Sequence, residues 1–306
     1  MAGRNYERLP IEKFGSHLLG SGDLDPIYLA LHRLKLDTPS LGKFLMAYWT
    51  YYSAAVACYA ADQDDDHFWL VMETAAKNET ETPVGGRWPR GHERRHCRGQ
   101  QALTCVADLK RQYHHQPGAM HLSIAGQATL NALAAGAMKD GGDRIPFKYV
   151  TEEAQKHCLF GPWIGFKIAD MLERLQIARV SFDEAAVFMF KDPYKSALML
   201  YRQRSGIPDN AVLKDEHGAI HHVVEYLTDH FNDYNAPPVY ERPVGLQEVE
   251  TILCKWKSHM NGHYPLNNDI MEIRHGLKDW LPVSALARAF YDAMPEGLTD
   301  VPAMRD

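Results

Sequence analysis

The sequence predicts a mainly α-helical fold. Apolar residues recur at three- and four-residue spacing, as on a helix with one buried face, in the segments 42–61, 121–137, 163–176, 182–203, 220–232, 246–258 and 283–293. Alternating apolar and polar residues, which would indicate strands, are confined to short runs near 146–150 and 211–220, the second a candidate hairpin. Breaks rich in glycine, proline or arginine separate the helical segments at 78–100, 140–146 and 235–245.

The first helical segment needs a separate argument, because Phe44 to Ala61 is a run without charged residues and is nearly long enough to cross a membrane. Its interior contains several tyrosines and Trp49, whereas a membrane span keeps its aromatic residues at its two ends. We therefore expect a buried core helix. Farther along the chain, Ser181 or Asp183 could cap the predicted helix 182–203.

The breaks suggest an N-terminal helical part (1–140), a central part (146–234) and a C-terminal part (245–306). We expect one catalytic unit over residues 1–306. It could consist of two packed helical lobes: 1–140, with the Arg-rich loop 78–100, and 146–306, with a hairpin at 157–172 and a C-terminal segment at 245–275.

Composition limits the class of protein. The 306 residues are 45% hydrophobic and 24% charged, as in globular proteins, and the net charge of −6 excludes a generally basic nucleic-acid coat but not a local basic site. The cysteines are odd in number and form no CxxC pair, which indicates reduced, intracellular cysteines: Cys58, Cys97, Cys105, Cys158 and Cys254. The opening MAGRNYERLP has no apolar core, so no signal peptide is expected.

The Arg-rich loop is the first candidate functional segment. It reads RWPRGHERRHCRG over 87–99 and contains one acid, Glu93, against five arginines: Arg87, Arg90, Arg94, Arg95 and Arg98. Arginine matches phosphate oxygens with two parallel donors, and the glycines allow a phosphate to approach the backbone. We favour a phosphate clamp that includes Trp88. The alternative is a solvated loop paired with the acidic run Asp62, Asp64, Asp65 and Asp66.

The second candidate is GPWIGFKIADM at 161–171, where Gly161 and Gly165 lie between two helical patterns. It resembles the hairpin of a helix-hairpin-helix element, which offers backbone N–H groups to a DNA phosphate. Pro-Trp-Ile replaces the usual single residue between the glycines, and a simple Gly-Pro turn between helices is the alternative.

Two more residues extend this resemblance. In helix-hairpin-helix DNA glycosylases an Asp follows the hairpin by one helix and a turn, and lyase-type members carry an amine near the second glycine. Asp183 and Lys167 fall in those places, although the spacing is two residues short. The resemblance implies a glycosylase-like helical architecture, with additional N-terminal helices and the Arg-rich loop. The alternative for Asp183 is an ordinary helix cap.

The third candidate is LCKWKSHMNGHYPLNND at 253–269. It places a thiol, cations and hydrogen-bonding groups at a predicted helix end: Cys254, Lys255, Lys257, His259, Asn261, Tyr264 and Asp269. Cationic neighbours can lower the pKa of Cys254 and make it a nucleophile, whereas the alternative is a buried, inert thiol. His259 and His263 would share a metal ion only if the helix continued through Asn261-Gly262, so we expect no metal.

Together, and in this order, the three segments resemble those of the phage amino acid:DNA transferases, also described as α-glutamyl/putrescinyl thymine pyrophosphorylases. This family modifies DNA bases and is thought to be related to helix-hairpin-helix glycosylases. The resemblance covers about 40–275. It implies that an amine from an amino acid or a polyamine joins the 5-methylene carbon of pyrophosphorylated 5-hydroxymethyluracil in DNA, and that pyrophosphate leaves.

The candidate residues fit this reaction. The arginines would stabilise the leaving pyrophosphate, and Gly161, Gly165, Lys255 and Lys257 would bind phosphate. Asp183, Cys254 and Lys167 would be catalytic, and Trp88, His259, Asn261, Tyr264 and Asp269 would contact the substrates. The implied partners are modified DNA and a small amine, with no membrane and no cofactor, in the cytoplasm of an infected bacterial host.

Two other functions remain open: a DNA glycosylase that acts on a modified base, and a non-catalytic DNA-binding protein. No P-loop, dinucleotide-binding fingerprint, GxSxG or HExxH motif occurs, so kinase, dehydrogenase and hydrolase functions have no support.

Overall fold

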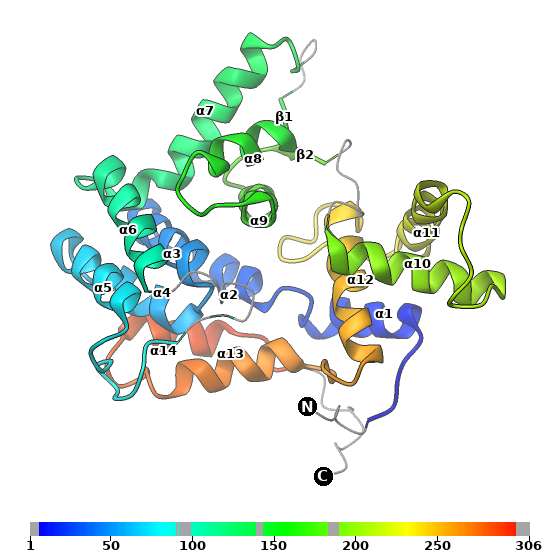
Figure 1. Cartoon of the computed structure of the whole chain (residues 1–306). Helices are drawn as coiled ribbons and strands as arrows, with labels where there is room; N and C mark the ends of the chain where they lie inside the picture. The colour runs from blue at the N-terminus through cyan, green and yellow to red at the C-terminus, as the bar shows by residue number, and fades with distance from the viewer. Residues whose placement is uncertain (1–5, 90, 92–98, 139–142, 183–189, 298–306) are drawn as a thin grey trace. The chain divides into compact units, whose positions relative to one another are not determined.

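The computed structural model describes residues 6–89, 91, 99–138, 143–182 and 190–297. The fold is mainly α-helical, as predicted (Figure 1). The only strands in these ranges are β1 (Ile145–Pro146) and β2 (Val180–Ser181), which pair in parallel. No helix in these ranges is both long and apolar enough to cross a membrane.

The chain forms two compact units, each assembled from separate segments. Unit 1 comprises residues 1–26, 182–271 and 295–306, and unit 2 comprises residues 27–181 and 272–294. These boundaries differ from those of the expected lobes, 1–140 and 146–306. The difference arises because the first 26 residues join the later helices, whereas residues 146–181, which include the hairpin segment, and residues 272–294 join the earlier ones.

Unit 1 packs helices from both ends of the chain around one core. Its helices are α1 (Ile11–Ser21), α10 (Lys191–Ser205), α11 (Glu216–His230) and α12 (Leu246–Met260), with the start of α13 (Asn268–Lys278). Phe14 and Leu18 on α1 are buried in the same apolar cluster as Ile252 and Trp256 on α12. A Cβ on Gly15 would lie 2.3 Å from the ring of Phe231, so α1 requires glycine at this close approach.

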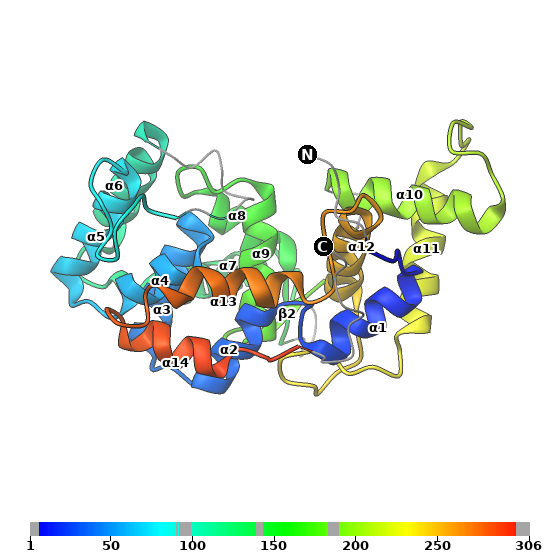
Figure 2. The ribbon, with the colours of Figure 1, turned by 90° about the horizontal axis from the view of Figure 1, so that it is seen from below.

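Unit 2 contains the remaining helices: α2 (Pro26–Leu34), α3 (Thr38–Tyr51), α4 (Ala54–Ala61), α5 (Asp65–Lys77), α6 (Gln100–Tyr113), η2 (Pro117–Ala119), α7 (Met120–Ala134), α8 (Phe147–Gln155), α9 (Pro162–Arg174), α14 (Ala285–Ala293) and the rest of α13. α3 is the central helix, and Phe44, Leu45 and Trp49 are completely buried. α14 packs against α4, and Figure 2 shows α13 running beside α14.

The uncharged segment 42–61 is buried, as expected, but it is two helices rather than one. α3 ends where Tyr52 adopts a left-handed conformation with a φ of 53°. Ser53 is extended, and its hydroxyl accepts a hydrogen bond from the backbone N–H of Val56, which starts α4. Neither residue is a glycine or proline, so the break gives little signal in the sequence.

Other expected elements also differ. Residues 211–220 form no hairpin, because α11 already starts at Glu216 with the Asp215 carboxylate as its cap. The strand expected near 146–150 is only β1, and α8 follows at once. In the described part of the predicted helix 182–203, α10 begins at Lys191, while Ser181 lies in β2.

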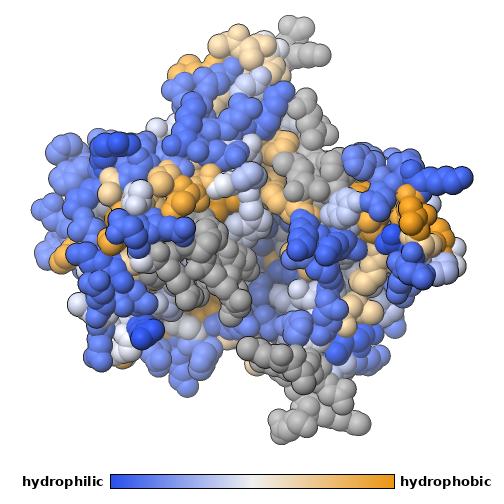
Figure 3. Space-filling model, viewed as in Figure 1, coloured by the Kyte–Doolittle hydropathy of each residue, from blue (hydrophilic) through white to orange (hydrophobic). Residues whose placement is uncertain are grey.

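Helix α7 carries an exposed apolar face, because Leu122, Leu130 and Leu133 are each about half exposed. Figure 3 shows apolar surface at the end of α7, whereas the surface over α5 is mostly hydrophilic.

Candidate functional site

The hairpin segment joins two helices that pack against each other, α8 and α9. Gly161 is the N-cap of α9, without a side-chain cap, and Pro162 occupies the first helical position, where a missing N–H has no cost. Gly165 lies inside α9, and a Cβ there would be 3.2 Å from Thr151 on α8. Among the described residues no side chain caps α9 at Gly161, whereas Gly165 allows the two helices to approach closely.

A hydrogen bond from α6 holds the turn before α9. The Asp108 carboxylate accepts the backbone N–H of Cys158 at 3.1 Å, and it also pairs with Arg111. Leu159, in the same turn, adopts the left-handed conformation with a φ of 63°. The start of α9 is thus fixed by packing on α8 and by an anchor on α6.

Lys167 lies one turn into α9 and is 8% exposed, with its Nζ 5.8 Å from the ring centroid of Phe166. Lysine side chains are rarely buried to this extent in proteins. Asp183, the proposed partner in catalysis, lies outside the described residues.

The start of the Arg-rich loop is anchored by Trp88. Its backbone N–H donates to the Asn78 side chain at 2.9 Å, and its buried ring lies against Tyr59 and Trp280. Arg87, next to it, is exposed. Trp88 is therefore a structural anchor in unit 2. Arg90, Arg94, Arg95 and Arg98 lie outside the described residues.

The acidic run that could neutralise this loop has other partners. Asp62 accepts hydrogen bonds from Ser284 and from the backbone of Leu286, at the start of α14. Asp64 caps α5 through the N–H of His67, and Asp65 pairs with Lys43 at 2.6 Å. These three carboxylates thus cap or connect neighbouring helices of unit 2.

The Arg-rich loop and the hairpin segment approach each other at Tyr52. The N–H of Gly91 donates to the carbonyl of Tyr51 at 3.0 Å, and a Cβ on Gly91 would lie 2.2 Å from the carbonyl oxygen of Tyr52. The Tyr52 ring in turn lies 5.0 Å from that of Trp163, the second residue of α9. Both candidate phosphate-binding segments of unit 2 thus share one aromatic neighbour.

In unit 1, three predicted residues of the C-terminal segment converge. Lys255 Nζ lies 2.7 Å from the Asp269 carboxylate and 5.3 Å from the ring centroid of Tyr264. The same ammonium donates to the backbone carbonyls of Asp23 and Leu24, at 2.7 and 2.5 Å. An ammonium has three N–H donors. Because all three have protein partners, Lys255 would have to release one of them before it bound a phosphate.

Asp23 completes this cluster and was not predicted. Its side chain is completely buried and accepts the N–H of Ile270 at 2.9 Å and the hydroxyl of Tyr264 at 3.2 Å. Burial, together with the nearby Asp269 carboxylate, raises the pKa of Asp23 to about 7, although Lys255 opposes the shift. For Lys255, burial lowers the pKa, but the surrounding carboxylates outweigh it and leave the pKa raised. Burial raises the pKa of Tyr264 as well.

His259 has a structural environment. It is completely buried and stacks on Phe14 with the ring centroids 4.5 Å apart. Its Nδ1 lies 2.8 Å from the carbonyl of Tyr264, and its Nε2 accepts the N–H of Leu9 at 2.9 Å. A neutral imidazole has one donor and one acceptor, so both are used. Burial lowers the pKa of His259, consistent with the neutral form.

The remaining predicted residues lie on or after α12. Cys254 is half-buried, and its side chain is a thiol rather than part of a disulfide. Lys257 forms an ion pair with Asp192 of α10. Asn261 is exposed at the C-cap, and because α12 ends at Met260, helical spacing does not continue to His263. The cations beside Cys254 are thus both paired with carboxylates.

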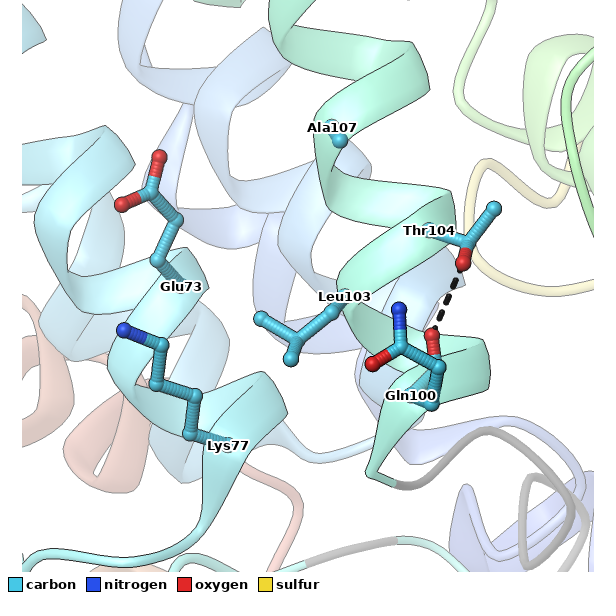
Figure 4. Close-up of a pocket in the computed structure, with 6 residues that line it drawn as sticks. All are labelled: Glu73, Lys77, Gln100, Leu103, Thr104 and Ala107. Atoms are coloured by element: carbon cyan, nitrogen blue, oxygen red, sulfur yellow. Dashed lines mark hydrogen bonds between the residues drawn. The ribbon is translucent and has the colours of Figure 1, made fainter.

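An open groove lies between α5 and α6, with a volume of about 360 Å³. Figure 4 shows Glu73 and Lys77 on α5 facing Leu103 on α6, near the start of that helix. Glu73 also pairs with Lys110 at 2.6 Å. None of these residues was predicted to be functional.

Three residues of these candidate clusters were not predicted from the sequence: Asp23, Tyr52 and Trp163. Asp23 lies in a short stretch without a motif and reaches Lys255 only through the fold. The sequence holds a weak indication of the other two. Tyr48 and Tyr52 are four residues apart, as on one face of a helix, and Trp163 lies inside the hairpin motif.

Comparison with known proteins identifies the family. The family model "Amino acid:DNA transferase" matches residues 19–263. A relative from Pseudomonas phage PaMx11, named glycinyltransferase, is 50% identical over 304 residues, which cover 96% of this chain and 98% of that protein. A relative from Delftia phage PhiW-14, named putrescinyltransferase, is 23% identical and covers 87% of this chain and 78% of that protein. The chain therefore belongs to the amino acid:DNA transferase family and is an enzyme of that class.

Proposed function

We propose that this enzyme joins the nitrogen of glycine to the 5-methylene carbon of pyrophosphorylated 5-hydroxymethyluracil in DNA and releases pyrophosphate. The observation that carries the choice of glycine is the 50% identity, over nearly the whole of both chains, to the protein named glycinyltransferase. The relative named putrescinyltransferase is only 23% identical. The form of the DNA substrate follows from the resemblance of the three sequence segments to the family.

The leaving pyrophosphate must have its charge stabilised, and the Arg-rich loop supplies the donors for this. Arg87 is exposed at the start of the loop, and Arg90, Arg94, Arg95 and Arg98 follow in the sequence. Planar guanidinium groups bind phosphate oxygens through paired hydrogen bonds and stabilise charge as it develops.

The target base must leave the duplex before it reaches catalytic groups. The uncapped start of α9 at Gly161 can accept a backbone phosphate, because its first N–H groups have no partner within the helix. This arrangement supports a glycosylase-like grip on the strand during base flipping. Lys167, our candidate for a catalytic amine, lies about one turn farther along the same helix and is 8% exposed.

Cys254 is our candidate nucleophile. Its thiolate would add to C6 of the uracil ring, and the ring electrons would expel pyrophosphate from the 5-methylene carbon to leave an exocyclic methylene. The glycine nitrogen would then add to that methylene carbon, and the returning electron pair would release the thiolate from C6. The half-buried position of Cys254 and its reduced thiol support this role.

The attacking amine must be neutral, so a base has to take its proton. Asp183 is our candidate for this base, from its place after the hairpin in the sequence. Asp269, whose side chain is 31% exposed, is the accessible acid of the Lys255 cluster and our candidate for holding the donor ammonium, with Tyr264 beside it. Both relatives come from bacteriophages, so we place the reaction in an infected bacterial host.

Mass spectrometry of nucleosides tests the proposal. Duplex DNA carrying pyrophosphorylated 5-hydroxymethyluracil is incubated with the enzyme and with glycine, glutamate, serine or putrescine in separate reactions. We expect the glycine adduct and free pyrophosphate. Release of a free base would instead indicate a glycosylase, and an unchanged nucleoside with all four amines would refute the transfer reaction.

A second experiment tests the covalent step. Cys254→Ser should lose nearly all turnover, whereas Cys158→Ser, another half-buried thiol, should keep it. The wild-type enzyme, denatured during a reaction without amine, should carry a covalent DNA adduct that Cys254→Ser lacks. Near-normal turnover by Cys254→Ser would exclude the thiolate mechanism and leave direct displacement by the amine.

A further inference from the structure

A column of aromatic rings runs from the core of unit 2 toward its surface. Phe290 lies 5.3 Å from Phe44, Phe44 lies 5.8 Å from Tyr48, and Tyr48 lies 4.7 Å from Tyr52, between ring centroids. All three pairs are stacked. Phe44, Tyr48 and Tyr52 are spaced by four residues, so α3 and its C-cap present them on one face. Trp163 continues the column 5.0 Å beyond Tyr52.

Exposure increases along this column. Phe290 and Phe44 are completely buried and Tyr48 is 6% exposed, whereas Tyr52 and Trp163 are only half-buried. The inner rings therefore hold the outer ones in place, and the outer pair keeps apolar ring surface in contact with solvent. A large aromatic side chain gains most by full burial, so a rigid, half-open pair is suited to complete its packing with a ligand.

The outer pair lies where both phosphate-binding candidates meet. Trp163 is next but one to Gly161, at the start of α9, and Tyr52 contacts the backbone of Gly91 in the Arg-rich loop. A DNA strand held by these segments would bring its bases close to the two rings. Nucleobases have flat π faces, and stacking on aromatic side chains is a general way to hold a base that has left its neighbours.

We propose that Tyr52 and Trp163 form a stacking platform for the nucleobase that leaves the duplex. The inference rests on the proposed function, because that reaction requires the base to leave the stack. The platform is preorganised, since the stack on Tyr48 and the left-handed backbone at position 52 already fix the tyrosine ring. Tyr52 and Trp163 are thus positioning residues for the DNA substrate.

The test is a double-mutant cycle between side chain and base. Affinity is measured for a duplex with one 5-hydroxymethyluracil and for the same duplex with an abasic site at that position. Removal of a stacking side chain weakens binding by roughly 5- to 150-fold. We expect Trp163→Leu and Tyr52→Leu to show a loss in this range on the first duplex and almost none on the abasic duplex. Trp163→Phe should recover most of the loss.

The controls separate stacking from folding and from charge. Tyr149→Leu, a half-buried tyrosine of α8 outside the column, should bind both duplexes as the wild type does. The salt dependence of affinity should keep its slope in Trp163→Leu, because no phosphate contact is removed. An equal loss on both duplexes, or no loss in any variant including Trp163→Ala, would overturn the platform.

The readout is binding, so it is independent of glycine transfer. If the side-chain effect depends on the base while no amine is transferred to pyrophosphorylated DNA, the platform stands and the proposed function fails. If glycine is transferred but the leucine variants bind both duplexes normally, the function stands and the platform fails.

Discussion

At the scale of single residues, the least predictable feature is the Lys255 cluster of unit 1, which consists of Asp23, Lys255, Tyr264 and Asp269. Asp23 and Lys255 are 232 residues apart in the sequence, and yet Lys255 donates to the Asp23 carbonyl and lies near its carboxyl group. Lys255, Tyr264 and Asp269 could be predicted as a group, because they share one short segment of unusual composition. Asp23 could not, because only the packing of α1 against α12 brings it there.

The raised pKa of Asp23 predicts a dependence of stability on pH. Its pKa is about 7 in the folded protein against 3.8 ordinarily, so between these values the folded state binds a proton that the unfolded state does not. The contribution of Asp23 to stability is therefore fully present below pH 3.8 and is lost as the pH rises through 7. Relative to Asp23→Asn, the wild type should lose at most about 1.4 kcal/mol per pH unit in this window.

Urea unfolding of both proteins from pH 5 to pH 8 measures this difference, and other titrating groups cancel between them. Asp192→Asn serves as the control, because it removes an exposed carboxylate, the partner of Lys257, instead of the buried one. If the free energy of unfolding changes with pH in parallel for the wild type and Asp23→Asn, the carboxyl group of Asp23 is ionised in the folded protein throughout this pH range.

At the scale of elements, the apolar periodicity predicts α7, α9, α11, α12 and α14 to within a few residues. It misses α1, α2, α5, α6, α8 and α13. Of these, α6 and α13 are rich in charged and polar residues, so few apolar residues mark their buried faces in the sequence. It also joins α3 to α4, because Tyr52 and Ser53 end one helix and start the next without a glycine or proline.

The position of Gly165 inside α9 predicts a packing role. A Cβ at 3.2 Å from Thr151 is tighter than ordinary contact, so Gly165→Val should push α8 and α9 apart and destabilise the protein by roughly 1–3 kcal/mol. Gly126→Ala in α7 is the matched control: its Cβ meets nothing within 4 Å, and the substitution should stabilise the protein by up to about 1 kcal/mol.

Thermal unfolding measures both glycine variants, and DNA affinity measured in parallel separates packing from recognition. A third variant, Gly165→Ala, separates the two roles further. If it bound DNA more weakly at an unchanged melting temperature, this glycine would contact the DNA. The sequence motif alone could not separate the two functions, because a glycine in a hairpin motif serves either close packing or a bound phosphate.

At the scale of the whole molecule, the charges of the chain are unevenly distributed. The net charge is −6, yet five arginines and a single acid occur between residues 87 and 98. Exposed charges act over roughly 10 Å at 0.1 M salt, so charges within that distance of a bound phosphate affect it far more than the net charge of the chain does. An acidic enzyme with a local cationic loop should bind DNA strongly only where that loop is engaged.

This distribution predicts how binding depends on salt and on the pyrophosphate group. Arg94→Gln together with Arg95→Gln should reduce the slope of log affinity against log salt by about one for each phosphate that the protein no longer neutralises. The double variant should also lose most of the preference for pyrophosphorylated over unmodified duplex, because the added phosphates need the same donors.

Lys77→Gln, which removes an exposed cation of α5, is the control and should keep both the salt slope and the preference for the pyrophosphorylated duplex. Titrations of labelled duplexes between roughly 50 and 200 mM salt, a range over which phosphate contacts weaken steeply, measure both quantities. If the double variant weakened both duplexes equally, the loop would hold the DNA backbone, and the pyrophosphate would have to be stabilised by other residues.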